Sequence, residues 1–131
     1  MKTITTWKTG QAFESTYNNR KIEVDGGGGF SPKALLLTGL AACSGIDVVD
    51  ILEKMRVPFA SLNIDVQTEQ TEADPKVFKD LHMVFRLKTG EENLDKVRKA
   101  IDLSLEKYCG VAAMLRKNSS ISYTIELEPE P

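Results

Sequence analysis

The stretch ALLLTGLAACSGIDVVDIL, at residues 34–52, decides the fold because it reads as one long apolar helix with a cysteine at its middle. Ser31 is a good N-cap ahead of it, and Pro32 suits the first helical position, where no backbone N–H is needed. The pattern continues to Arg56 and stops before Pro58, which predicts a helix roughly 39 Å long.

This helix needs more cover than a small domain can give it. The run at residues 34–46 is apolar nearly all round the helix axis, so it requires a neighbour on every side. A chain of this length folds to a radius of gyration of only about 14 Å, and one small sheet cannot surround such a helix. Burial against a second copy of the chain would, so we expect a homodimer.

The rest of the chain alternates between strand and helix patterns. Three short N-terminal strands precede the loop DGGGGF at 25–30, which lacks the Gly-Lys-Ser/Thr of a P-loop. After the long helix come two strands joined by a turn at 71–78, a helix up to Cys109, a short helix at 111–117 and a last strand. The expected apolar positions of the strands are Ile4, Trp7, Phe13, Tyr17, Ile22, Val24, Leu62, Ile64, Val66, Leu81, Met83, Phe85, Leu87, Ile121, Tyr123, Ile125 and Leu127, and those of the later helix are Leu94, Val97, Ile101, Leu105 and Tyr108.

This order is not a regular βαβ repeat. We therefore expect an α+β fold with antiparallel sheets around the long cysteine-bearing helix, in one domain over residues 1–131. The acidic tail EPEP at 128–131 is expected to fray.

Composition excludes several classes of function. The chain has 131 residues, a net charge of −2 and 27% charged residues, without the basic surface that nucleic acid requires. No run of Lys or Arg suits an anionic membrane, and the apolar run at 34–46 is too short to span a bilayer. The N-terminus lacks a signal peptide, so a cytoplasmic protein is expected, in which two cysteines rarely form a permanent disulfide.

The two cysteines are the candidate reactive groups. Cys43 has small neighbours, including Ala42 and Ser44, which leave room beside the sulfur for another backbone or a substrate. Cys109 lies where one helix ends and another begins, and a helix N-terminus would lower the pKa of its thiol. On spacing alone, two structural thiols are favoured over a reactive pair, because free cysteine is among the most buried residues.

Other catalytic schemes have less support. His82, the only histidine, lies on the strand face opposite Leu81 and Met83, which indicates a solvent-facing residue and not a base. The ligand spacing of a zinc site is missing, so no metal is expected. Asp47 follows Cys43 by one helical turn, where it would raise the thiol pKa or bond to a polar group across an interface.

Three segments carry a resemblance to a known family. SPKALLLTGLAACSGIDVVDILEKMR, DPKVFKDLHMVFRL and SLEKYCGVAAMLRK, in this order and separation, resemble the OsmC/Ohr family of osmotically inducible and organic hydroperoxide resistance proteins. The resemblance covers almost the whole chain and is nearer to the shorter OsmC-like proteins than to the long-studied resistance enzymes. It implies an intertwined α+β homodimer with active sites at the subunit interface.

The resemblance also implies a chemistry. Cys43 would be the peroxidatic thiolate of a thiol-dependent peroxidase and Cys109 its resolving thiol. A small hydrophobic organic hydroperoxide would be the substrate. No cofactor would be bound, and an external dithiol of the lipoyl type would reduce the disulfide.

The chain departs from the family pattern at one position. Family members pair an early-strand Arg with a Glu that follows the helix-opening proline, but Lys33 stands at that second position here. Arg20 is the one arginine before the helix, and it is either that active-site residue or an exposed turn residue. Asp47 or Glu106 would then have to supply the carboxylate. An OsmC-like protein that binds a small molecule or a sulfur species without peroxide turnover is the alternative function.

Overall fold

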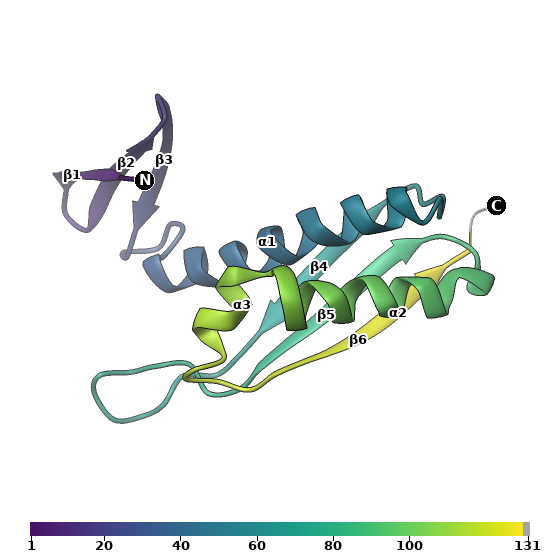
Figure 1. The fold of residues 1–131 in the computed structure, drawn as a ribbon. Helices are drawn as coiled ribbons and strands as arrows, with labels where there is room; N and C mark the ends of the chain where they lie inside the picture. Colours follow the sequence, from purple (N-terminus) through teal and green to yellow (C-terminus); the bar gives the residue numbers. More distant parts are fainter. Residues whose placement is uncertain (130–131) are drawn as a thin grey trace. The chain divides into compact units, whose positions relative to one another are not determined.

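The structure is a computed structural model that describes residues 1–129. It divides into two compact units, residues 1–38 and the chain from Gly39 onwards, and helix α1 (Pro32–Lys54) begins in the first unit and continues into the second. The α+β class is confirmed (Figure 1). The expected fraying of the tail at 128–131 falls partly on residues 130 and 131, outside the described part of the chain.

The N-terminal unit carries a three-stranded antiparallel sheet in the order β1-β2-β3. Gly10, Asn18 and Asn19 all have positive φ in the turns between the strands. The sheet buries little of its own apolar surface, and Trp7 is 63% exposed. Its strands are β1 (Ile4–Thr9), β2 (Ala12–Tyr17) and β3 (Arg20–Asp25).

Helix α1 starts and stops where the sequence predicts, within two residues. The Ser31 hydroxyl accepts a hydrogen bond from the Ala34 N–H at 3.2 Å, which confirms the N-cap. The helix ends at Lys54, and Arg56 then adopts a left-handed φ of 58° ahead of Pro58. At 23 residues, the helix is longer than its apolar run and meets the length and hydropathy of a membrane span, as core helices of soluble proteins also do.

The second unit contains the mixed sheet β4-β5-β6, formed by β4 (Leu62–Gln67), β5 (Leu81–Lys88) and β6 (Ile121–Glu128). Strands β4 and β5 are antiparallel, as predicted, but β5 and β6 are parallel, which corrects the expectation of purely antiparallel sheets. The reason is the connection: residues 89–120 form a helical crossover, which returns the chain to the same end of the sheet.

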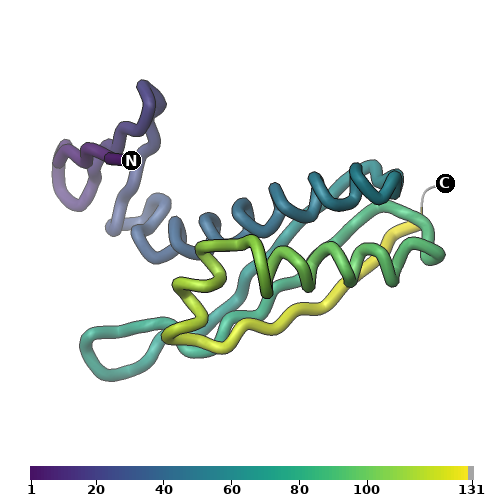
Figure 2. The backbone as a smooth tube through the Cα atoms, viewed as in Figure 1, coloured from purple at the N-terminus to yellow at the C-terminus, as the bar shows by residue number. Residues whose placement is uncertain are grey.

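Helices cover one face of this sheet, and the core lies between them. From Gly39 onwards α1 lies along this face beside α2 (Leu94–Leu103) (Figure 2). Gly45 lets α1 approach β4 closely, since a Cβ there would lie 3.1 Å from Ile64 Cδ1. On the same face Tyr123 of β6 meets Phe85 edge to face, and the Tyr123 hydroxyl donates to Asp102 of α2 at 2.5 Å. The central strand contributes Leu81, Met83 and Phe85, all fully buried.

Candidate thiol site

Cys43 lies near the middle of α1, at the edge of its buried face. Its side chain is half-buried, whereas Ser44 and Gly45, the next two residues, are buried. The thiol is free. Half-burial of a thiol with small neighbours leaves it both shielded and reachable, as a thiol that meets a small substrate must be.

Cys109 is positioned by an irregular turn that the sequence does not reveal. The helix α2 passes into a π-helical turn, η2 (Ser104–Tyr108), and the Cys109 N–H closes it by donating to the Ser104 carbonyl at 2.7 Å. Helix α3 (Gly110–Leu115) begins directly afterwards, one residue before the predicted short helix. The Cys109 sulfur serves as its N-cap and accepts the Ala112 N–H at 3.3 Å.

The π-helical turn decides which residues face the interior. The regular spacing predicts Tyr108 on the buried face after Ile101 and Leu105, but Tyr108 is 55% exposed and Cys109 is only 3% exposed. The prediction for Tyr108 is therefore wrong. A π-helical turn has more residues than an α-helical one, so the next residue along the chain takes the inward position.

The pKa of Cys109 is raised to about 11. Burial is the largest cause, since it disfavours the charged thiolate. The N–H of Ala112 acts in the opposite direction, and the neighbouring Cys43 and Asp47 raise the pKa further. The predicted lowering of this pKa by a helix N-terminus is thus overcome by burial, and Cys109 is a protonated thiol at neutral pH.

These interactions place three of the predicted site residues together. Cys43 and Asp47, one turn apart on α1, both act on the Cys109 thiol. Asp47 also accepts a hydrogen bond from the Ser104 hydroxyl at 2.9 Å, so it does bond to a polar group on a neighbouring element. Ser104 contacts Ser44 Oγ as well, at 3.0 Å.

Ser44 and Ser104 were not among the predicted site residues. Both are fully buried. The available signal was a polar residue inside an apolar stripe, because Ser104 stands between the inward positions Ile101 and Leu105. A buried hydroxyl requires a partner, and here the two serines meet each other across the helices.

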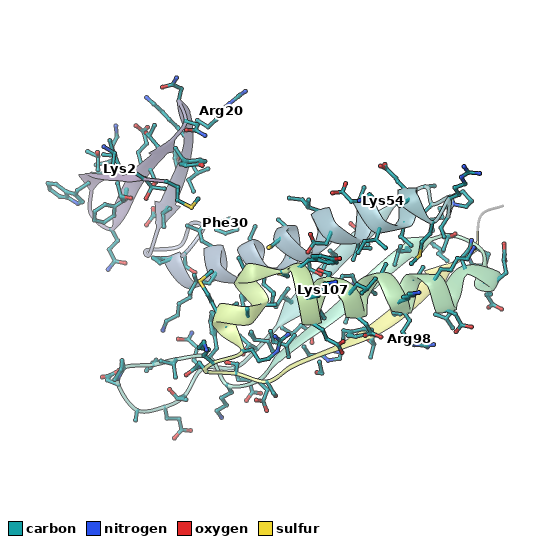
Figure 3. The ribbon with its side chains drawn as sticks, viewed as in Figure 1. Lys2, Arg20, Phe30, Lys54, Arg98 and Lys107 are labelled. Atoms are coloured by element: carbon teal, nitrogen blue, oxygen red, sulfur yellow. The ribbon has the colours of Figure 1, made fainter. Side chains whose placement is uncertain are left out.

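The remaining predicted residues lie elsewhere. Glu106 is exposed on η2 and lines an open pocket of about 390 Å³ whose wall includes Arg116 and Tyr123. Arg20 begins β3 in the N-terminal unit, with an exposed side chain (Figure 3), and its two sequence-based interpretations both stay open. Lys33 is half-buried in the first turn of α1.

The structure also bears on His82 and on a metal site, the two schemes that have little support in the sequence. His82 bonds to Ser122 through Nδ1 at 2.8 Å, on the sheet face opposite the core, as predicted. Within residues 1–129, no three His, Cys, Asp or Glu side chains are grouped so that they could hold a metal ion.

Comparison with known proteins places this arrangement in context. The sequence model of the OsmC-like protein family matches residues 25–124. Protein YhfA of Escherichia coli K12 is 35% identical over 126 residues, which cover 92% of this chain and 93% of YhfA. A crystal structure of a hypothetical protein from Aquifex aeolicus has a TM-score of 0.90 at 26% identity, covering 99% of this chain and 97% of its own.

A structure with a functional name shares the fold at lower identity. It is an organic hydroperoxide resistance protein OsmC from Legionella pneumophila, with a TM-score of 0.68 and 16% identity. The match covers 96% of this chain and 97% of that one. At this identity the likeness concerns the fold alone.

Proposed function

Because this chain belongs to the OsmC-like protein family, we propose that it is a thiol-dependent peroxidase that reduces organic hydroperoxides. The observation that carries the proposal is the pair of free thiols on adjoining elements. Cys43 is half-buried, and Cys109 is buried and close enough for Cys43 to raise its pKa. The name of the Legionella relative supports the class of substrate.

The proposed reaction has three balanced steps. The Cys43 thiolate attacks one oxygen of the hydroperoxide, the O–O bond breaks, and the alcohol leaves with a proton while Cys43 becomes a sulfenic acid. The Cys109 sulfur then attacks the Cys43 sulfur; an S–S bond forms and water leaves. An external dithiol of the lipoyl type restores both thiols by exchange and is itself oxidised to a disulfide.

The environments of the two thiols fit these separate roles. Cys109 is buried and protonated at neutral pH, so it is protected from the peroxide and is poorly suited to be the first nucleophile. Cys43 is the more accessible of the two. The difference in burial therefore supports the proposed division into an attacking and a resolving thiol.

We also propose that the active protein is a homodimer in the cytoplasm. Large apolar side chains stay uncovered in each unit of the single chain, among them Trp7 on β1 and Ile46 beside the thiol site, which is 64% exposed. Such exposure is typical of surfaces that a partner covers. A second copy would also enclose the half-buried Cys43, and a hydrophobic hydroperoxide would suit the resulting apolar surroundings.

The experiment that tests the function is rapid mixing of the reduced protein with cumene hydroperoxide. Thiol loss and disulfide formation are followed in the wild type and in Cys43→Ser and Cys109→Ser. We expect fast oxidation that requires Cys43, and loss of the disulfide in Cys109→Ser, with hydrogen peroxide reacting more slowly. Slow oxidation that does not depend on Cys43 would contradict the peroxidase proposal.

One observation favours a second function. Lys33 occupies the position at which the resemblance implies a Glu that pairs with the active-site Arg. A protein without that pair would bind a small hydrophobic molecule or a sulfur species at the same thiols and would not turn over peroxide. Such a protein would react with a small thiol reagent in its native state but would leave cumene hydroperoxide unconsumed.

A further inference from the structure

The buried hydroxyl of Ser104 joins the segment that carries Cys109 to the helix that carries Cys43. It lies 2.9 Å from Asp47 Oδ2 and 3.0 Å from Ser44 Oγ, with the Ser44 carbonyl oxygen at 3.4 Å. Ser44 directly follows Cys43 in the chain, and Asp47 follows one turn later. The Ser104 hydroxyl therefore contacts both ends of the helical turn of α1 that follows Cys43.

Asp47 is the strongest of these three acceptors. A hydroxyl group has one hydrogen to donate, so the three contacts compete for it. The carboxylate is charged and is also the nearest acceptor, and hydrogen bonds to ionised groups are about twice as strong as neutral ones. Ser104 and Ser44 are fully buried, so water does not reach the two hydroxyl groups, whereas Asp47 is half-buried.

The backbone of the same residue holds Cys109. The Ser104 carbonyl accepts the Cys109 N–H at 2.7 Å, which is the bond that closes the π-helical turn. Ser104 thus hydrogen-bonds to α1 through its side chain and to Cys109 through its main chain.

Resting on the proposed function, we propose that Ser104 is a positioning residue for the disulfide-forming step: together with Asp47 it holds the Cys109 thiol beside Cys43. Neither residue touches the hydroperoxide in this role. Two thiols held in place behave as though each were at high concentration around the other, so holding them favours the disulfide over separate thiols.

The test measures the Cys43–Cys109 disulfide without peroxide. Reduced protein is equilibrated at pH 7 with mixtures of oxidised and reduced glutathione, so that one glutathione disulfide is consumed and two glutathione thiols are released for each protein disulfide. The products are trapped with acid and quantified by mass. We expect Ser104→Ala to lower the equilibrium constant about tenfold, the factor that corresponds to one hydrogen bond to a charged group.

Ser119→Ala is the matched control. Ser119 is also a buried serine, and its hydroxyl also bonds to a backbone carbonyl, that of Phe78, at 3.3 Å. Ser119 lies outside the thiol site, so Ser119→Ala should change the equilibrium constant by less than about twofold. An equal loss in both serine variants would mean a general loosening of the fold and would overturn the proposal.

Asp47→Ala tests the same bond from α1 and replaces Ser104→Ala if that variant does not fold. We expect a loss of similar size, and no further loss in the double variant, because residues that share one interaction are not additive. Losses that multiply in the double variant would overturn the proposal. At pH 7 the Cys109 thiol is protonated with or without the Asp47 charge, so the comparison reports on position.

The result is separable from the outcome of the peroxide experiment. If the disulfide forms and depends on Ser104 while cumene hydroperoxide does not oxidise Cys43, the positioning role is supported and the peroxidase function fails. If the wild type forms no Cys43–Cys109 disulfide in any glutathione mixture, the positioning role is overturned.

Discussion

At the scale of single residues, Cys109 shows how two local effects are ranked. The N–H of Ala112 at the start of α3 stabilises its thiolate, but burial destabilises the thiolate more, and Cys43 and Asp47 add to the effect of burial. The N-terminus of a short helix is a modest influence compared with removal of a charge from water. Cys109 is therefore a protonated thiol at neutral pH.

The proposed resolving step should consequently depend steeply on pH. The thiolate is the nucleophile, so the rate of disulfide formation from the Cys43 sulfenic acid should rise about tenfold per pH unit above pH 7 and level off near pH 11. Stopped-flow measurement after one equivalent of peroxide checks this. Asp47→Asn should move the midpoint to lower pH, and a wild-type plateau below pH 9 would contradict the prediction.

At the scale of elements, helix α1 approaches β4 through a glycine. A Cβ on Gly45 would lie 3.1 Å from Ile64 Cδ1, whereas a Cβ on Gly39, in the same helix, would meet nothing within 4 Å. Space is therefore restricted at one of these two helical glycines and open at the other. The close approach also brings the buried face of α1 onto the sheet core.

A matched pair of substitutions tests this packing. Gly45→Val should lower the free energy of unfolding by about 1–3 kcal/mol, because the added methyl groups overpack the contact with Ile64. Gly39→Val adds the same atoms in open space and should lower it by less than about 0.5 kcal/mol. Urea unfolding followed by circular dichroism measures both, and equal changes would be evidence against the close approach.

At the scale of the whole molecule, the uncovered apolar side chains and the raised pKa values have separate consequences. Ile46 and Met114 are more than 60% exposed in the single chain. This exposure of large apolar side chains supports the proposed dimer. The Tyr123 hydroxyl donates a hydrogen bond to Asp102, and burial together with this bond raises the pKa of Tyr123 to about 12. Like Cys109, it holds its proton more tightly when folded.

The dimer prediction concerns Ile46. Replacement with Glu should give a monomer by size-exclusion chromatography with light scattering at micromolar concentration, because the new charge would be buried at the interface. Glu53→Gln, at an exposed position of the same helix, should leave the dimer intact. A monomeric wild type under these conditions would end the dimer proposal.

The raised pKa values of Cys109 and Tyr123 predict that the folded protein loses stability at alkaline pH. The pKa of Cys109 rises from 9.0 to about 11 on folding, so its contribution is present below pH 9 and is lost as pH rises through 11. The contribution of Tyr123 is lost in the same way between pH 10 and about 12. The unfolding midpoint in urea should therefore fall above pH 9, and Tyr123→Phe should flatten the later part of this decline.

The sequence by itself determined the local elements, the family and the two thiols. Helix α1 begins and ends within two residues of its predicted bounds, because the Ser31 cap, Pro32 and Pro58 act over only a few residues. The tertiary structure alone decided three things: the parallel pairing of β5 with β6, the π-helical turn that buries Cys109 in place of Tyr108, and the bond from Ser104 to Asp47. The strand pairing and the Ser104–Asp47 bond join residues far apart in the chain, which a local pattern does not reveal. Burial, which is the largest influence on the Cys109 pKa, is likewise decided by tertiary packing.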